Sequence, residues 1–278
     1  DGPDIIDTWN EGKVADVEGY YENAKINRVY VDRVHVKKAF AEYAAAYNAD
    51  DPKIKLKIDH TYRVAALCER IAKAAGMCAY DVELAWLSGM LHDVGRFEQI
   101  KRYNTFSDAD SVDHAKFGAD LLFKDGLIST FLKGMVKCTG YKPGALEDRY
   151  SSDGVFLYDR LNKSDMEMLE LAIRCHNMYR IPQGLNSREQ AFCNVLRDAD
   201  KVDIFKVNID TPLEEIYNTT TEELMKSNIT DEVLEAFDEE HCILKAIRRT
   251  PADTVIGHVS LAYELVYDES CLLYTSPS

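Results

Sequence analysis

An imidazole and a carboxylate stand side by side at His92-Asp93, directly after the apolar run from Leu84 to Leu91. Desolvating such a pair at the end of a buried helix is costly unless something binds it. The chain offers more donors of the same two kinds. They are His60, His114, His176 and the late acidic stretch Asp198-Ala199-Asp200-Lys201. These are the donor types that a divalent metal site needs, so a metal-dependent hydrolase is the first interpretation.

Each of these four histidines aligns with apolar residues at helical spacing. His60, for example, lies four residues before Val64 and eleven before Ile71. Side chains at such spacings share one face of a helix, so we expect all four imidazoles to point into the same helical bundle. A single histidine on an apolar face is more often a hydrogen-bonded core residue than a ligand. Four of them beside an aspartate favour a metal site.

The donor types also indicate which metals would suit the site. Neutral imidazole and carboxylate suit manganese, iron, nickel, cobalt or zinc. The seven cysteines are scattered and include no Cys-x-x-Cys pair, which argues against a structural zinc site. The donors outnumber those that one tetrahedral ion needs. A carboxylate such as Asp93 can bridge two ions, and that would account for the surplus.

The elements that position these residues are predicted to be helices. Apolar residues recur at helical spacing over 32–47, 58–75, 79–93 and 111–123. A polar and aromatic loop is expected over 96–110, and Gly- and Tyr-rich loops that form an insertion or a lid are expected over 126–165. Two capping boxes, Ser164-x-x-Glu167 and Ser187-x-x-Gln190, open two later helices, and the second helix carries the acidic stretch. The fold class is therefore all-α, a helical bundle.

The 278 residues, 46% of them apolar, suffice for one large domain. We expect residues 1–30 to be a polar N-terminal segment or linker, and residues 31–270 to form a single helical domain. Residues 271–278 resemble the translation of a sequencing adapter, so we expect a non-native tail, and the start of the chain looks incomplete or processed. An ordinary polar tail is the alternative.

A formal net charge of −15 disfavours long nucleic acids, because neutralising their phosphates requires clustered Lys and Arg. It permits a small phosphate ester, since bound divalent cations reverse the local field. No apolar stretch is long enough to span a membrane, and no membrane partner is expected. Scattered cysteines, odd in number, suit free thiols in the reducing cytoplasm.

The order His60, then His92-Asp93, then Asp200 resembles the HD-domain metal-dependent phosphohydrolase superfamily over roughly residues 40–210. The additional His114 and His176 resemble the subset of that superfamily that holds two metals. The resemblance implies an HD-domain-like bundle with two divalent ions. It implies that His60, His92, Asp93 and Asp200 hold the first ion, and that Asp93, His114 and His176 hold the second.

The last ligand rests on the resemblance alone. On a helical wheel Asp203 lies closest to the apolar stripe, and Asp198 and Asp200 flank it. We choose Asp200 because the superfamily's final aspartate follows a small residue, here Ala199. Asp203 would then be a buried, helix-anchoring acid and Asp198 a solvated one. Among the cations near these ligands, Arg96 and Lys201 are the best candidates to hold a phosphate.

The leading hypothesis is hydrolysis of a nucleotide or another small phosphate ester by a metal-activated water, with Asp93, Arg96 and Lys201 in catalytic roles. The segment 176–185 faintly resembles the HD-GYP cyclic-dinucleotide phosphodiesterases but lacks their second histidine, glutamate and Asp-Gly.

One alternative to hydrolysis is a di-iron oxygenase of the same superfamily, such as myo-inositol oxygenase, because the two classes of enzyme share these metal ligands. Another is a sensor that binds a nucleotide without turnover. The sequence indicates neither the metal, the substrate nor the oligomeric state.

Overall fold

The computed structural model describes residues 31–48, 50–132, 137–138, 156–157, 161, 163–210, 212, 214 and 219–275. Within these ranges the regular secondary structure is helical, apart from β1 (Lys137–Cys138) and β2 (Phe156–Leu157), which pair antiparallel. The prediction of an all-α fold is confirmed. The predicted polar segment 1–30 and residues 276–278 of the predicted tail lie outside the described residues, and residues 271–275 fall in a helix.

The chain forms two compact units, and the predicted helical domain over 31–270 stays a prediction. The first comprises Asp1–Asn177 and Ile181–Leu196, and the second comprises Met178–Arg180 and Arg197–Ser278. The first unit contains α3 (Arg33–Ala45), α4 (Pro52–Ala74), α5 (Ala79–Leu91), α6 (Val94–Tyr103), α7 (His114–Ala119), the π-helical turn η1 (Asp120–Lys124), α8 (Ile128–Leu132) and α9 (Lys163–Cys175). Helix α10 (Ser187–Asp210) contributes residues 187–196 to the first unit and 197–210 to the second.

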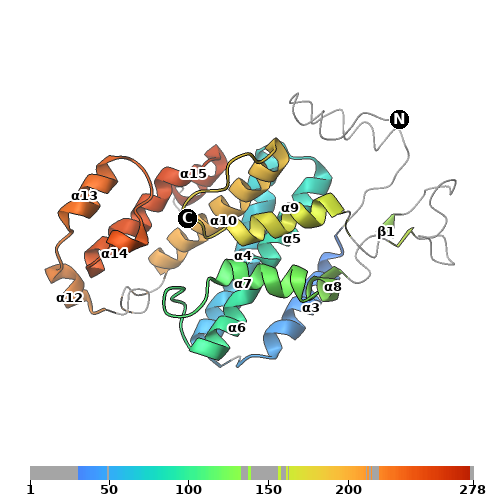
Figure 1. Ribbon diagram of the computed structural model, residues 1–278, viewed down its shortest axis with the longest axis horizontal. Coiled ribbons are helices and arrows are strands. Elements are labelled where there is room, and N and C mark those ends of the chain that lie inside the picture. The colour runs from blue at the N-terminus through green and yellow to red at the C-terminus, as the bar shows by residue number, and fades with distance from the viewer. Residues whose placement is uncertain are drawn as a thin grey trace. The chain divides into compact units, whose positions relative to one another are not determined.

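The core of the first unit is the helix pair α4 and α5, which lie side by side (Figure 1). Helix α5 is apolar on nearly every side and is buried from Leu84 to Leu91. Gly89 permits the close approach, because a Cβ at this position would lie 2.6 Å from the Cα of Ala65 on α4. A larger residue would force the two helices apart, together with the histidines that they carry.

Local capping explains where several helices begin. Asp32 and Asp51 each accept a hydrogen bond from a backbone N–H in the first turn of α3 and α4. At α10 the capping box is formed by Asn186 and Glu189, one residue before the predicted pair. Of the predicted box at 164–167, Ser164 lies inside α9, which begins at Lys163.

The predicted loop over 96–110 is wrong in its first half, because α6 occupies Val94–Tyr103. Val94, Phe97 and Ile100 recur at three-residue spacing and are buried on one side of this helix. The polar side chain of Gln99 is buried as well and is fully hydrogen-bonded, donating to Ser111 Oγ at 2.8 Å and to Val112 O at 3.1 Å.

The second unit is built from short helices. They are α12 (Thr221–Lys226), α13 (Asp231–Asp238), η3 (Lys245–Ile247), α14 (Pro251–Val259), η4 (Ser260–Glu264) and α15 (Asp268–Thr275). Asp198 was predicted to be solvated, and this is wrong. Its side chain is fully buried and accepts backbone hydrogen bonds from Val266 and Tyr267, each at 3.0 Å. Asp203 is buried, as predicted.

A buried ion network ties α5, α9 and α10 together within the first unit. Arg188 donates to Asp81 Oδ1 at 2.7 Å and lies 2.7 Å from Asp165 Oδ1. Tyr80 donates to the second oxygen of Asp165. Both aspartates are only 1% exposed, so the guanidinium is needed to compensate two buried negative charges.

We expect Arg188→Met to lower the free energy of unfolding by about 3–5 kcal/mol, because it leaves two buried carboxylates without their counter-ion. Arg102→Met is the matched control. It removes an arginine that is 51% exposed and paired with Glu98, and should cost about 1 kcal/mol or less. Urea denaturation measures both. Equal losses for the two variants would contradict a stabilising role of the buried network.

None of the helices in the described ranges is both long and apolar enough to cross a lipid bilayer.

Candidate metal centre

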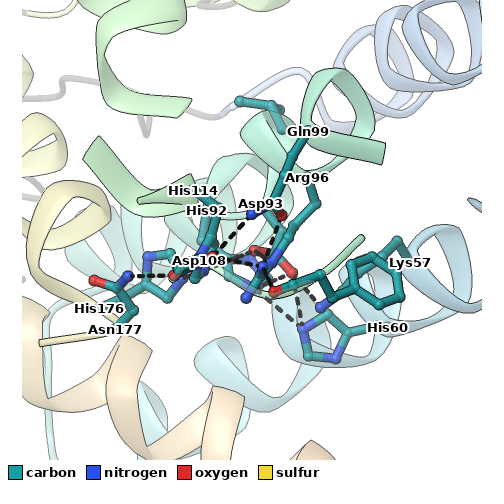
Figure 2. A network of polar contacts seen from close by, with 12 residues as sticks. Lys57, His60, His92, Asp93, Arg96, Gln99, Asp108, His114, His176 and Asn177 are labelled. Carbon is teal, nitrogen blue, oxygen red and sulfur yellow. Dashed lines mark hydrogen bonds and ion pairs between the residues drawn. The ribbon is translucent and has the colours of Figure 1, made fainter. Parts of the chain in front are cut away.

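Five of the predicted metal ligands come together inside the first unit (Figure 2). His60 lies within α4, and His92 and Asp93 occupy the turn between α5 and α6. His114 is the first residue of α7, and His176 directly follows α9. Each of these side chains is buried, with no residue more than 4% exposed. Two helices and two turns thus deliver buried polar groups to one place, which is costly unless they share a ligand.

The Nε2 atoms of His60 and His92 and one oxygen of Asp93 form a small triangle, which we call the first triad. The two Nε2 atoms lie 3.2 Å apart, and Asp93 Oδ2 lies 3.4 Å from His60 and 3.5 Å from His92. A point equidistant from three such corners lies about 1.9 Å from each, close to the ~2.0–2.2 Å of metal–nitrogen and metal–oxygen bonds.

The other oxygen of the same carboxylate forms a second triad with His114 and His176. The two Nε2 atoms lie 3.1 Å apart, and Asp93 Oδ1 lies 3.5 Å from His114 and 3.8 Å from His176. The point equidistant from these three atoms is about 2.0 Å from each, again the length of a metal–ligand bond. Asp93 therefore belongs to both triads, with one oxygen in each.

Hydrogen bonds on the outer side of the rings fix which nitrogen faces the triads. His92 Nδ1 donates to Gly89 O at 2.8 Å, and His176 Nδ1 donates to Ile173 O at 2.7 Å. Both acceptors are carbonyls three residues back, in the last turn of a helix, where carbonyls lack an intrahelical partner. Because a carbonyl can only accept, Nδ1 carries the proton. In the neutral ring Nε2 is therefore left with a lone pair.

His114 is oriented by a carboxylate. Its Nδ1 donates to Asp108 Oδ2 at 2.7 Å. Burial and, to a smaller extent, the nearby charge of Arg96 lower the pKa of His114 to about 4, so the ring is neutral near pH 7. Burial would raise the pKa of Asp108, but the hydrogen bond from His114 and the charge of Arg96 outweigh it, and the pKa is lowered. Asp108 is thus an ionised acceptor for a neutral ring.

The second triad consequently consists of three acceptor atoms that face one another. Asp93 Oδ1 is buried and has no hydrogen-bond donor among the described residues. Lone pairs on three atoms this close repel one another unless a cation or a proton lies among them. The donor set is imidazole and carboxylate at metal-bond spacing, so the residues present fit a divalent transition metal.

Asp93 also lies between two cations. It stands at the N-cap of α6, yet its side chain caps no backbone N–H and instead faces the histidines. Lys57 Nζ donates to Asp93 Oδ2 at 2.6 Å, and Arg96 Nε lies 3.7 Å from Oδ1. Burial would raise the pKa of Asp93, but Lys57 and the surrounding imidazoles outweigh it and hold the pKa well below its usual range.

A second glycine contact sets the position of His114. A Cβ on Gly95, in the first turn of α6, would lie 2.4 Å from His114 O and 2.7 Å from Gly118 N. The start of α6 therefore packs directly on the backbone of α7, which places Asp93 and His114 on either side of the contact. Larger residues at Gly95 would push these two ligands apart.

Two residues of this site were not identified from the sequence. Lys57 lies three residues before His60, on the same face of α4. This helical spacing from a predicted ligand is the feature of the sequence that could have identified Lys57. Asp108 accepts from His114, from Arg96 NH1 at 2.9 Å and from Gln99 at 3.0 Å. Nothing in the sequence distinguishes it from its acidic neighbours Asp110 and Asp113, because its partners come from other elements.

The remaining predicted site residues belong to the second unit. Asp200 lies on α10 and is half-buried, and its role as the sixth ligand stays a prediction. Lys201 is buried and pairs with Glu264 at 3.0 Å, and Arg197 pairs with the same carboxylate at 3.0 Å. The Lys201 ammonium is thus paired with a carboxylate of its own unit. Its role in phosphate binding also stays a prediction.

We expect Asp108→Asn to weaken metal binding at the second triad about 10- to 100-fold, because an outer carboxylate that orients a histidine contributes that much to metal affinity. Asp110→Asn is the matched control, since Asp110 is exposed and only two residues away. Titration calorimetry with Mn²⁺ measures both variants. Unchanged affinity in Asp108→Asn would show that Asp108 does not support His114.

Comparison with known families gives a match over most of the chain. A family model described as the HD domain matches residues 58–250 of the 278, a range that contains all six predicted ligands. Neither the curated proteins nor the solved structures include a significant match to this chain.

Proposed function

The chain belongs to the HD-domain family, most of whose members are metal-dependent hydrolases, and on this basis we propose that it is a phosphohydrolase that binds two divalent ions. Its substrate would be a nucleotide or another small phosphate ester. The proposal treats the two triads as two adjacent ion sites that share the carboxylate of Asp93.

One observation supports the proposal more than any other. The two oxygens of Asp93 each complete a separate triangle of donors with edges of 3.1–3.8 Å. A structural aspartate in a histidine-rich core would need only one hydrogen-bonded partner per oxygen. A carboxylate that serves two triangles matches the two-ion sites of hydrolases that act on phosphate esters.

The ligands would be His60, His92 and Asp93 for the first ion and Asp93, His114 and His176 for the second, with Asp200 proposed as a further ligand of the first. Bound divalent ions lower the pKa of a coordinated water toward ~7 and polarise phosphoryl oxygens. The protein's own contribution is to orient the imidazoles. The Nδ1 hydrogen bonds described above turn Nε2 of His92, His114 and His176 toward the triads.

Arg96 is proposed to hold the substrate's phosphate. Its NH1 group is fixed by Gln99 Oε1 and by Phe106 O, each at 2.7 Å, and by Asp108. These contacts hold the guanidinium so that its buried Nε faces Asp93 Oδ1 at 3.7 Å. A cation fixed beside the centre can stabilise negative charge that develops on a phosphoryl group without reorganising during the reaction.

The proposed activity is tested by loading chelator-treated protein with Mn²⁺, Fe²⁺, Co²⁺, Ni²⁺ or Zn²⁺ and measuring hydrolysis, as phosphate released or, for cyclic nucleotides, as nucleoside monophosphate formed. The substrates are nucleoside monophosphates, diphosphates and triphosphates, cyclic nucleotides and simple phosphomonoesters. We expect metal-dependent hydrolysis of at least one nucleotide under anaerobic conditions. Oxygen consumption by the iron-loaded protein with a polyol, together with no phosphate release, would instead indicate an oxygenase. Tight nucleotide binding without turnover in any metal would indicate a sensor.

A further inference from the structure

The carboxylate of Asp93 is already paired with a positively charged side chain, that of Lys57. Lys57 Nζ lies 2.6 Å from Asp93 Oδ2, a short charge-assisted hydrogen bond. The Lys57 side chain is 17% exposed and that of Asp93 is 2% exposed, so the ammonium approaches a buried carboxylate from the more open side. Lys57 and His60 project from the same face of α4 (Figure 2).

The oxygen that Lys57 contacts is a corner of the first triad. An ion bound to this oxygen would lie about 2 Å from it. Because the ammonium lies 2.6 Å from the same atom, ion and ammonium could be separated by no more than about 5 Å, whatever their directions. Repulsion between a divalent ion and an ammonium at this range is strong where water is largely excluded. The two cations therefore compete for Asp93 Oδ2.

The Lys57 ammonium also has a second, aromatic partner nearby. Lys57 Nζ lies 5.5 Å from the centre of the Phe106 ring, within the range of a cation–π contact. Phe106 is half-buried in the segment between α6 and α7, and Arg96 Cζ lies 5.7 Å from the same ring. The long, flexible stem of lysine allows its charge to shift by a few ångströms without any movement of the helix.

We propose that Lys57 is an exchangeable counter-ion of the metal centre. Its ammonium neutralises Asp93 when the first triad holds no ion, and it moves toward the Phe106 ring when an ion binds. The inference rests on the proposed function, because it takes the first triad to be an ion site. It adds that the protein's own lysine weakens the binding of the first ion while it protects the metal-free fold from an uncompensated buried carboxylate.

The test compares Lys57→Met with wild type in Mn²⁺ titration calorimetry and in thermal unfolding. Lys55→Met is the matched control, since it removes an exposed lysine from the same helix. We expect Lys57→Met to bind the first Mn²⁺ about 10-fold more tightly, as removal of a charge-assisted hydrogen bond to Asp93 implies. After chelator treatment the same variant should unfold at a lower temperature than wild type, and Mn²⁺ should abolish the difference. Lys55→Met should change neither quantity.

Two further variants keep the inference testable if Lys57→Met folds poorly. Lys57→Arg retains the competing charge and should not tighten Mn²⁺ binding. Phe106→Leu removes the aromatic partner toward which the ammonium is proposed to move, and should weaken Mn²⁺ binding relative to wild type. Equal or weaker Mn²⁺ binding in Lys57→Met, with normal binding by the wild-type protein, would overturn the counter-ion role and leave the proposed function standing. A wild-type protein that binds no Mn²⁺ would overturn both.

Discussion

Asp93→Asn is expected to abolish the binding of both ions and to reduce phosphate release by at least ~10³-fold, the scale of losing a group that stabilises the transition state. The reason is geometric, because one oxygen of Asp93 lies 3.4–3.5 Å from the imidazoles of the first triad and the other lies 3.5–3.8 Å from those of the second. An amide supplies only one oxygen, and its NH₂ group would face acceptor nitrogens in the other triad. Calorimetric titration and phosphate release measure the two effects.

Asp59→Asn serves as the control for this variant. Asp59 is exposed and immediately precedes His60, so the substitution removes a nearby charge without touching either triad. It should leave both the number of bound ions and the rate of phosphate release close to wild type. An Asp93→Asn protein that still bound two ions and turned over substrate would contradict the bridging role of Asp93.

His176→Gln is expected to remove one ion and retain the other. His176 contributes to the second triad, 3.1 Å from His114, and the first triad does not include it. We expect the number of bound Mn²⁺ ions to fall from two to one, and the activity to fall by at least ~10²-fold, because a two-ion site stabilises both the attacking and the leaving oxygen.

The matched control for this experiment is His241→Gln, since the His241 side chain is 36% exposed and lies in the second unit. It should bind two ions and retain activity. If His176→Gln still bound two ions with wild-type affinity, the second triad would not be an ion site. Loss of both ions in His176→Gln would show that the triads are not separable.

Most residues of the candidate site could be predicted because they are uncommon residue types in apolar surroundings. Buried histidines interrupt a helical apolar pattern visibly, and His92-Asp93 ends the most apolar stretch of the first unit. The all-α fold followed from the same periodicity. Helix α6 was missed because Gly95 and the polar residues after it resemble a loop. Its apolar positions are three residues apart and become clear only when Val94 is included.

The supporting residues could not be predicted, because their partners are distant in the sequence. Asp108 is an ordinary loop aspartate until the fold brings His114, Arg96 and Gln99 against it. Lys57 is one of several lysines at the start of α4 until the turn after α5 places Asp93 beside it. The burial of Asp198 depends on backbone donors nearly 70 residues away, which a helical wheel cannot represent.

The most direct measurement of the central claim is anomalous X-ray diffraction from crystals of the Mn²⁺-loaded protein, collected on both sides of the manganese absorption edge. The account predicts two manganese peaks, one among His60, His92 and Asp93 and the other among Asp93, His114 and His176, with the carboxylate of Asp93 between them. A single peak that contacts only one triad would contradict the two-ion site. No manganese peak at either triad would contradict the metal centre itself.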